Sequence, residues 1–379
     1  DDPVALDGLL EVHRYNEDWT GLERVLRRQI ELCHDPALRA ALTCRLASLR
    51  ELRFADLPGA KVLFRSALNN DPLHMPALRA LLRTSRATDD HATTARVAQV
   101  IAEHEEPRTA AALMLESARL HLDKLNDPDR AFEAMRAAVA HSPEPAILAA
   151  LGNLCERTAR WSDLAQVLEQ LREMADDAAE RAAIGLRLAL VQQQRLDDID
   201  AAIETLREAV NAAPDDLPAR QMLGRLYRRQ ERWEELIGLL SEERELFTDP
   251  QRQAATCYRI ADIFEHQLGD LEQAVGFYQQ ALDSVPGYRP AMRGISRAYR
   301  ILERHEDLIA VFEHELALAA GGAEKRTLLR RIAELGQQEL NDPAAAHGAY
   351  ERLLSLDPND LSTLRALRRI YTLGCRWDD

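Results

Sequence analysis

The chain of 379 residues carries 48 Lys and Arg against 63 Asp and Glu, for a formal net charge of −15, and 46% of its residues are apolar. This acidic balance argues against general nucleic-acid binding and membrane-surface binding, because both partners attract positive fields. No apolar run approaches the roughly 18–20 residues that span a bilayer, so direct membrane insertion is not expected. Aromatic residues make up only 5%, while Ala, Leu, Arg and Glu dominate, which favours helix over strand.

The five cysteines form no CxxC pair and are odd in number. Such cysteines are typical of core or surface positions in a reducing compartment and not of a disulfide framework. We therefore expect a cytoplasmic protein, with a periplasmic or other extracytoplasmic location left open, because a cleaved signal peptide would not be seen in part of a protein. Only three basic residues are Lys (Lys61, Lys124 and Lys325), a skew that indicates a GC-rich bacterial genome.

The sequence repeats itself at intervals of about 72 residues, marked by a Trp or His that we call the anchor. The anchors follow one another at intervals of 72, 70, 72, 72 and 72: Trp19, His91, Trp161, Trp233, His305 and Trp377. A fixed period indicates a repeat architecture, in which each unit stacks on its neighbours. In chain order we expect a partial unit 1–18, units 19–90, 91–160, 161–232, 233–304 and 305–376, and a partial unit 377–379. Apolar periodicity predicts four helices in each unit, about 21 in all.

A second pattern confirms this register, starting from one Ala in each unit that we call the signature alanine. The signature alanines are Ala60, Ala131, Ala202, Ala274 and Ala346, and twelve residues after them stand Pro72, Pro143, Pro214, Pro286 and Pro358. Four residues after them stand Phe64, Met135, Leu206, Tyr278 and Tyr350, and seven after them Ala67, Ala138, Ala209, Ala281 and, as the exception, Leu353. These positions share one helix face, where the small residue admits a neighbouring backbone and the large one fills the space beside it.

This A-x3-[large]-x2-A-x4-P pattern resembles the second half of a tetratricopeptide repeat (TPR), and Leu223 to Tyr227, LGRLY, resembles the first half. The resemblance covers the whole chain as about ten alternating TPR-like repeats, two in each unit. Half of the repeats are degenerate, because other residues stand where the family has Ala: Leu22, Thr94, Leu164, Leu236 and Leu308. The resemblance implies an all-α fold, a right-handed superhelical α-solenoid of antiparallel helix pairs, as one continuous array over residues 1–379.

Asp-Pro pairs mark predicted helix boundaries. Asp can cap free N–H groups and Pro fits the first helical position, which predicts helix starts at Asp35-Pro36, Asp127-Pro128, Asp249-Pro250 and Asp342-Pro343. Asp71-Pro72 and Asp357-Pro358 are expected where a helix ends, and Gly321-Gly322 in a turn. Both chain ends stop in phase with the repeat and show no polar capping helix, so we expect an excerpt of a longer protein.

No motif for catalysis, for a metal or for a cofactor is found in the sequence. His104-Glu105 and His305-Glu306 lack the second His of an HExxH zinc motif, and the GGAEKRT segment from Gly321 lacks the Gly that a phosphate loop places before its Lys. No Gly-x-Ser-x-Gly elbow occurs. We therefore predict a non-enzyme without cofactors. The Trp anchors recur with the repeat, so we expect them to pack between helix pairs instead of stacking on a ligand.

One set of arginines stands out at positions −12, −8 and −5 from the anchors. It comprises Arg79, Arg83 and Arg86; Arg225 and Arg228 with Arg229 beside them; Arg293, Arg297 and Arg300; and Arg365 and Arg369. The spacings place each group on one helix face. In TPR proteins that face of the first helix lines the concave groove, where peptides or partner helices bind. The resemblance therefore implies that these arginines bind a polypeptide through an acidic segment or a terminal carboxylate.

An internal role for the same arginines stays open. Acids at inward positions of adjacent helices could pair with them: Glu51, Asp262, Glu265 and Glu334. The arginine set is also missing near Trp161, where Ala149, Asn153 and Glu156 replace it, and near Trp19, where Asp7, Glu11 and Arg14 stand. A binding surface would therefore favour the C-terminal half.

The leading hypothesis for function is a non-catalytic protein-interaction scaffold that binds a partner polypeptide in its concave groove. Two alternatives are a structural subunit of a large assembly and a regulatory region of a longer protein with a catalytic domain elsewhere. The sequence predicts no nucleic-acid partner, and it does not indicate the oligomeric state.

Overall fold

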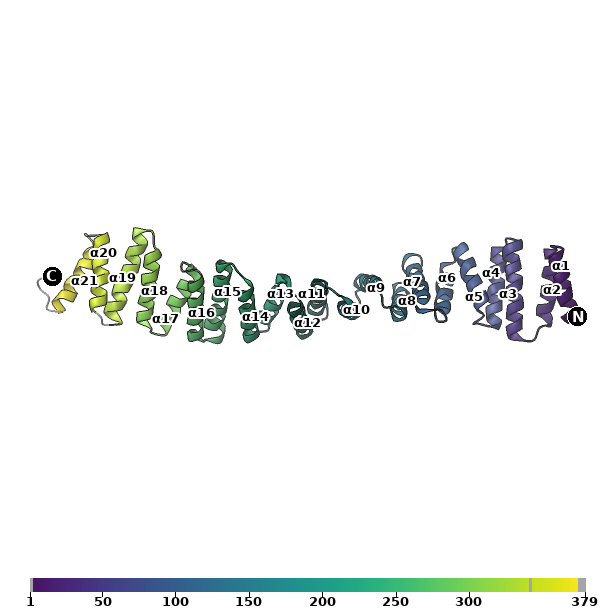
Figure 1. The fold of residues 1–379 in the computed structure, drawn as a ribbon, viewed down its shortest axis with the longest axis horizontal. Helices are drawn as coiled ribbons and strands as arrows, with labels where there is room; N and C mark the ends of the chain where they lie inside the picture. Colours follow the sequence, from purple (N-terminus) through teal and green to yellow (C-terminus); the bar gives the residue numbers. More distant parts are fainter. Residues whose placement is uncertain (1–2, 341–342, 374–379) are drawn as a thin grey trace. The chain divides into compact units, whose positions relative to one another are not determined.

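A computed structural model describes residues 3–340 and 343–373, and all regular secondary structure in these ranges is helical (Figure 1). The described ranges hold 21 α-helices and one short π-helical segment, in agreement with the expected number of helices. The chain divides into two compact units between Ala213 and Pro214, and each unit is described by itself. Whether they form one continuous right-handed superhelix stays a prediction.

The first unit contains twelve α-helices within its described residues. They are α1 (Pro3–Tyr15), α2 (Trp19–Leu32), α3 (Pro36–Arg53), α4 (Leu57–Asn70), α5 (Met75–Ala87), α6 (His91–Ala102), α7 (Pro107–Asp123), α8 (Pro128–His141), α9 (Pro145–Arg157), α10 (Trp161–Met174), α11 (Ala178–Arg195) and α12 (Ile199–Ala212).

The second unit contains nine α-helices and the π-helical segment within its described residues. They are α13 (Leu217–Arg229), α14 (Trp233–Leu246), α15 (Pro250–Ile263), η1 (Phe264–Leu268), α16 (Leu271–Ser284), α17 (Arg289–Ile301), α18 (His305–Leu318), α19 (Gly322–Gln338), α20 (Pro343–Leu356) and α21 (Leu361–Leu373). Odd-numbered helices are the first helices of the repeats and even-numbered helices are the second.

Within each unit, a helix packs mainly against the helices before and after it, which is the arrangement of stacked helix hairpins (Figure 1). The most extensive contacts join α3 to α4, α7 to α8, α11 to α12, α15 to α16 and α19 to α20. These are the pairs whose second helix carries a signature alanine as its fourth residue. The degenerate pairs, such as α13 with α14, make less extensive contacts. Their first helices are also shorter than α3, α7, α11 and α19. The predicted all-α, TPR-like solenoid is confirmed.

The small-large-small pattern forms the core of the well-matched repeats. All five signature alanines are fully buried, and so are Phe64, Leu206 and Tyr278 four residues after them. In the degenerate repeats Leu164, Leu236 and Leu308 are also fully buried. Burying one such side chain contributes about 1.5–3 kcal/mol. Repetition of these contacts supplies a core that runs from repeat to repeat.

The predicted Asp-Pro boundaries agree with the helix ends. Asp35, Asp127 and Asp249 each accept a hydrogen bond from a backbone N–H in the first turn, at 3.0–3.1 Å. Asp71 follows the end of α4, and Asp357 follows the end of α20. The predicted start at Asp342 lies outside the described residues, as do the anchor Trp377 and Cys375.

The anchors each begin a second helix and are half-buried: Trp19, His91, Trp161, Trp233 and His305. Two of the indole rings are in cation–π contact with a guanidinium group from a nearby first helix. Arg53 lies 4.2 Å from the ring centroid of Trp19, and Arg195 lies 4.6 Å from that of Trp161. No helix of the described chain is long and apolar enough to cross a membrane.

Among the described residues, nine turns between the two helices of a repeat each hold one residue in the left-handed backbone region. These residues recur with the period of the chain: Glu17, Ala55, Asp89, Asn126, Ala159, Asp197, Glu231 and Glu303, with φ between 51° and 57°, and Gly269, with φ of 70°. A side chain in this region costs roughly 1–2 kcal/mol, because Cβ crowds the following carbonyl oxygen. Glycine avoids that cost, and Asp and Asn tolerate the region better than other side chains, so the strain is greatest at the Ala and Glu positions.

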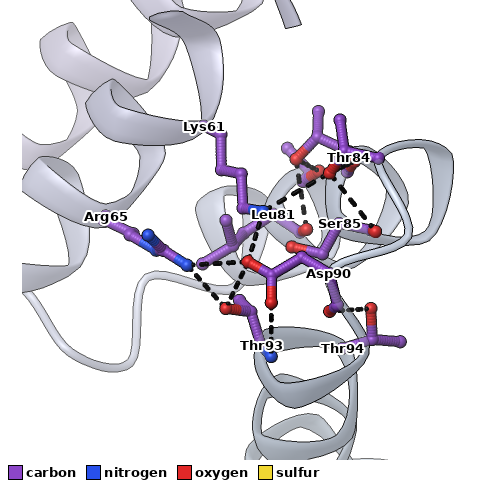
Figure 2. Close-up of polar contacts among 10 residues, drawn as sticks. Lys61, Arg65, Leu81, Thr84, Ser85, Asp90, Thr93 and Thr94 are labelled. Carbon is purple, nitrogen blue, oxygen red and sulfur yellow. Dashed lines mark hydrogen bonds and ion pairs between the residues drawn. The ribbon is translucent and has the colours of Figure 1, made fainter. Parts of the chain in front are cut away.

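A polar network fixes the turn between α5 and α6 (Figure 2). Asp90 caps α6 by accepting from the backbone N–H of Thr93 at 3.1 Å and from its hydroxyl at 2.8 Å. Lys61 and Arg65, both from α4, reach the same carboxylate, Arg65 at 3.0 Å. Although burial by itself raises the pKa of Asp90, hydrogen bonds from Lys61 and Thr93 outweigh it and hold the pKa well below its usual range. The network ties two helix pairs together.

We predict opposite effects for two turn substitutions. Gly269→Ala should lower stability by about 1 kcal/mol, because the added Cβ meets no neighbour within 4 Å and the loss is conformational. Ala159→Gly, with φ of 56°, should raise stability slightly by removing a crowded Cβ. Thermal unfolding followed by circular dichroism measures both. An unchanged midpoint for Gly269→Ala would contradict the strain interpretation.

We also predict that Asp90→Asn lowers stability by roughly 1 kcal/mol at neutral pH. Asn caps a helix about as well as Asp, so the loss reports the ion pairs with Lys61 and Arg65. Because the folded-state pKa of Asp90 is depressed, its contribution is present above the unfolded pKa and is lost as pH falls through the folded pKa. The difference from wild type should therefore shrink below about pH 4. The exposed Asp215→Asn, outside the left-handed turns, is the control, and a difference that persists in strong acid would refute this origin.

Candidate functional site

The eleven arginines of the predicted set lie on first helices and are all exposed. Three are on α5 in the first unit, and eight are on α13, α17 and α21 in the second. The structure separates them into arginines held by carboxylates of this chain and arginines that are not.

The arginines of α5 are held. Arg83 binds both carboxylate oxygens of Glu51, Nε to Oε1 at 3.0 Å and Nη2 to Oε2 at 2.6 Å. Arg86 binds Glu116 in the same forked way, with Nε 2.8 Å from Oε1. Arg79 Nη2 lies 2.7 Å from Oε1 of Glu105. On this helix the arginines therefore pair internally.

Arg297 binds Glu265, the most buried of the acids that pair with these arginines. Its Nη2 lies 2.7 Å from Oε2 of Glu265, whose side chain is only 5% exposed, and Tyr278 Oη donates to that oxygen at 2.6 Å. Burial raises the pKa of Glu265, but the hydrogen bonds from Arg297 and Tyr278 outweigh it and lower the pKa. Gly294 lies directly against the Tyr278 ring, where a Cβ would collide with it. Arg297 is therefore an exposed side chain held by a buried carboxylate.

The remaining seven arginines make no ion pair with any carboxylate of the described residues. They are Arg225, Arg228, Arg229, Arg293, Arg300, Arg365 and Arg369, and all lie in the second unit. Arg225 donates only to the carbonyl oxygen of Gln221 at 3.2 Å. Of the four acids considered as internal partners, Glu51 and Glu265 do pair with an arginine of the set, while Asp262 contacts His266 at 3.3 Å. The second unit thus exposes guanidinium groups at repeated positions.

Two cavities of the second unit lie beside these arginines. The first, of about 260 Å³, is lined by Arg228, Trp233, Tyr258, Arg259, Asp262, Ile263 and Gln267. The second, of about 230 Å³, is lined by Arg300, Leu308, Phe312, Arg331, Glu334, Leu335, Gln338 and Glu339. Five positions correspond at a spacing of 72 residues, Arg228 to Arg300 and Arg259 to Arg331 among them. The second cavity is the first one repeated one unit later.

The predicted set of arginines before the anchors does not include Arg259 and Arg331, which line these cavities. Each lies on the first helix that follows, α15 or α19, fifteen residues before a signature alanine. Counting back from the signature alanine as well as from the anchor would have found them. Trp233, expected to serve packing alone, also lines the first cavity.

A larger cavity of about 730 Å³ lies in the first unit between α4, α6, α7 and α8. It is lined by Arg65, Arg96, Arg130 and His121, but Arg65 is bound to Asp90 and Arg130 lies 3.4 Å from Asp127. His121 is buried, and burial lowers its pKa, so the imidazole is neutral. This cavity therefore offers few free charges.

The described residues contain no group of three or more His, Cys, Asp or Glu that could hold a metal ion. Cys33, Cys44, Cys155 and Cys257 are free thiols, and burial raises the pKa of Cys155 to about 11. Such a thiol is protonated and unreactive at neutral pH.

Comparison with family models finds the tetratricopeptide repeat. One model of this repeat matches residues 147–182, 219–244 and 256–289, and another matches residues 183–216. No curated protein matches the chain in sequence.

Several solved structures are similar to the chain. The C-terminal part of a TPR repeat-containing protein from Cytophaga hutchinsonii is 16% identical, covers 66% of this chain and 98% of its own, and has a TM-score of 0.33. A tetratricopeptide repeat protein from Parabacteroides merdae is 14% identical, and the match covers 69% of this chain and 98% of that protein, with a TM-score of 0.29. A chain in a structure of Naa15/Naa10 bound to HypK-THB is 13% identical, and the match covers 98% of this chain and 61% of that chain, with a TM-score of 0.34. Similarities of this size support no inference about function.

The family matches over residues 147–289 span the junction of the two units and include both well-matched and degenerate repeats. The small-large-small pattern is buried in the second helices before that range, and Ala346, Tyr350 and Leu353 are buried at the corresponding positions after it. The chain is therefore a TPR-like repeat array.

Proposed function

We propose that the chain is a protein-interaction scaffold whose second unit captures a partner polypeptide on the exposed face of α13, α17 and α21. The observation that carries this proposal is the set of seven arginines that recur on these helices without a carboxylate partner among the described residues. Guanidinium groups prefer planar anions, which they bind through two parallel hydrogen bonds. The partner therefore presents carboxylates, as an acidic segment or a chain terminus.

The proposed mechanism is capture by shape and charge, without bond making or breaking. The chain as a whole is acidic, with a formal net charge of −15, so this face is a local exception to its charge. An acidic partner would be repelled elsewhere and attracted here, which orients it on encounter. Because the arginines are exposed, the attraction should weaken as salt is added. Free cysteines support a reducing, cytoplasmic setting, which stays a prediction.

We predict that reversing Arg225, Arg293 and Arg365 to Glu weakens binding of a fluorescein-labelled oligoglutamate peptide by more than tenfold, about 1.4 kcal/mol or more. None of these arginines pairs with a described carboxylate, so the fold should be kept. Fluorescence anisotropy at low salt measures the affinity. The control reverses Arg24, Arg28 and Arg136 on second helices of the first unit, with the same change in net charge. Equal losses in both variants would show a general charge effect and contradict this face.

We further predict that Arg297→Ala lowers stability by about 2 kcal/mol, because it leaves the buried Glu265 carboxylate without its cation. Arg293→Ala, one helical turn away and without a described carboxylate partner, should change it by less than about 0.5 kcal/mol. Adding Glu265→Gln to Arg297→Ala should restore stability, since Gln337 stands at the equivalent position and accepts from Tyr350 Oη at 3.2 Å. Chemical unfolding measures all three. Similar losses for Arg297→Ala and Arg293→Ala would refute the division into held and available arginines.

A further inference from the structure

Two positions on successive first helices recur as a pair in every repeat unit, and we call each such pair a notch. One residue lies five before an anchor, and the other lies fifteen before the next signature alanine. The five notches are Arg14 with Arg45, Arg86 with Glu116, Glu156 with Arg187, Arg228 with Arg259, and Arg300 with Arg331. The first three lie in the first unit and the last two in the second.

Two of the notches are closed by an ion pair. Arg86 Nε lies 2.8 Å from Oε1 of Glu116, and Arg187 Nη2 lies 2.7 Å from Oε1 of Glu156. In the first pair the arginine precedes the anchor and the acid precedes the signature alanine, and in the second pair the two are exchanged. Both pairs nevertheless form an ion pair. The geometry of the stacked helices therefore brings the two side chains within bonding distance whichever of them is the acid.

In the second unit both notches hold two arginines, and the two arginines line one cavity. Arg228 and Arg259 line the cavity of about 260 Å³, and Arg300 and Arg331 line the cavity of about 230 Å³. Two guanidinium groups at such a position repel each other unless an anion lies between them. In the closed notches the chain supplies that anion, as Glu116 or Glu156. In the open notches it does not.

The acids already at these cavities leave the arginines available. Asp262 lines the first cavity and Glu334 the second, but neither makes an ion pair with an arginine of its notch. Arg259 is 3.7 Å from Glu243, the outer limit of an ion pair. Glu339 lies 3.9 Å from His305. Apart from that long contact of Arg259, no notch arginine of the second unit has a carboxylate partner among the described residues.

We propose that the two open notches of the second unit each bind one carboxylate of a single acidic polypeptide segment. The two carboxylates would take the place that Glu116 and Glu156 occupy in the closed notches, one repeat unit apart. The inference rests on the proposed function and adds to it Arg259 and Arg331, the requirement for two separated acidic groups, and the place of each group. The Arg14 and Arg45 notch lies in the other unit and is not part of it.

The lining of the cavities favours a protein carboxylate over a nucleic-acid phosphate. Each cavity joins its two arginines to apolar or aromatic side chains: Trp233, Tyr258 and Ile263 in the first, and Leu308, Phe312 and Leu335 in the second. The short apolar stem of Glu fits against such a wall while its carboxylate meets the arginines.

The test uses Arg259→Glu and Arg331→Glu, which place an acid where Glu116 stands and so close each notch from within. Each variant should bind the labelled oligoglutamate peptide about tenfold more weakly. The thermal midpoint should be unchanged or raised in Arg331→Glu, whereas Arg259→Glu also loses the contact of Arg259 with Glu243 at 3.7 Å. The matched control exchanges a closed notch, Glu156→Arg with Arg187→Glu, and should bind as wild type does. Arg259→Gln and Arg331→Gln remove the charge without closing the notch and should weaken binding too, which keeps the test valid if a Glu variant unfolds.

A second measurement tests the two-site register. A peptide with two glutamate clusters on a flexible Gly-Ser linker should bind more tightly than a peptide with one cluster, because the second contact becomes intramolecular. That advantage should vanish in Arg259→Glu and in Arg331→Glu alike. An advantage that survives either substitution overturns the pairing of the two notches.

The outcomes separate this inference from the proposed function. If both notch variants bind as wild type does while the Arg225, Arg293 and Arg365 reversal loses binding, the notches are wrong and the scaffold face stands. If none of these variants changes binding, both fail. If single-stranded oligonucleotide binds as tightly as oligoglutamate and is lost in the same variants, the site takes polyanions in general, and the acidic-polypeptide partner is overturned.

Discussion

The close approach of two helices at one small residue in each well-matched repeat is the contact on which the rest of this structure depends. The signature alanines, from Ala60 to Ala346, have no exposed surface, and the helix pairs that contain them make the most extensive contacts of the chain. Dispersion attraction falls steeply with distance. Two helices that approach closely at a small side chain therefore gain more packing energy than two helices that lie farther apart. Where Leu236 or Leu308 replaces the alanine, the two helices of the pair make less extensive contacts with each other.

Regular stacking sets which side chains meet between repeats. A residue five before an anchor meets a residue fifteen before the next signature alanine, and the identities at those two positions decide what the contact does. Arg86 with Glu116 is a bridge within the chain, whereas Arg228 with Arg259 is a pair of like charges beside a cavity. The same geometry thus gives a structural contact in one repeat and a candidate binding site in another.

Exposure alone does not separate these two roles. Arg297 and Arg293 both lie on the exposed face of α17, yet Arg297 neutralises a carboxylate that is almost fully buried. Removing Arg297 would leave that charge in a low-dielectric setting, while removing Arg293 would not. In a chain that uses Arg nearly everywhere for its positive charge, the partner of each guanidinium group is what assigns it to the fold or to a ligand.

The sequence by itself determined the repeat, the helix order, the buried small-large-small pattern and the Asp caps such as Asp35 and Asp127, because each depends on residues a few positions apart on one helix. It also placed the exposed arginines on one face. Only the tertiary structure decided which of them are held, since Arg86 and Glu116 are 30 residues apart and Glu156 and Arg187 are 31. Arg259, Arg331 and the cavity beside Trp233 likewise became visible only through stacking, because a notch exists only when two helices bring its halves together.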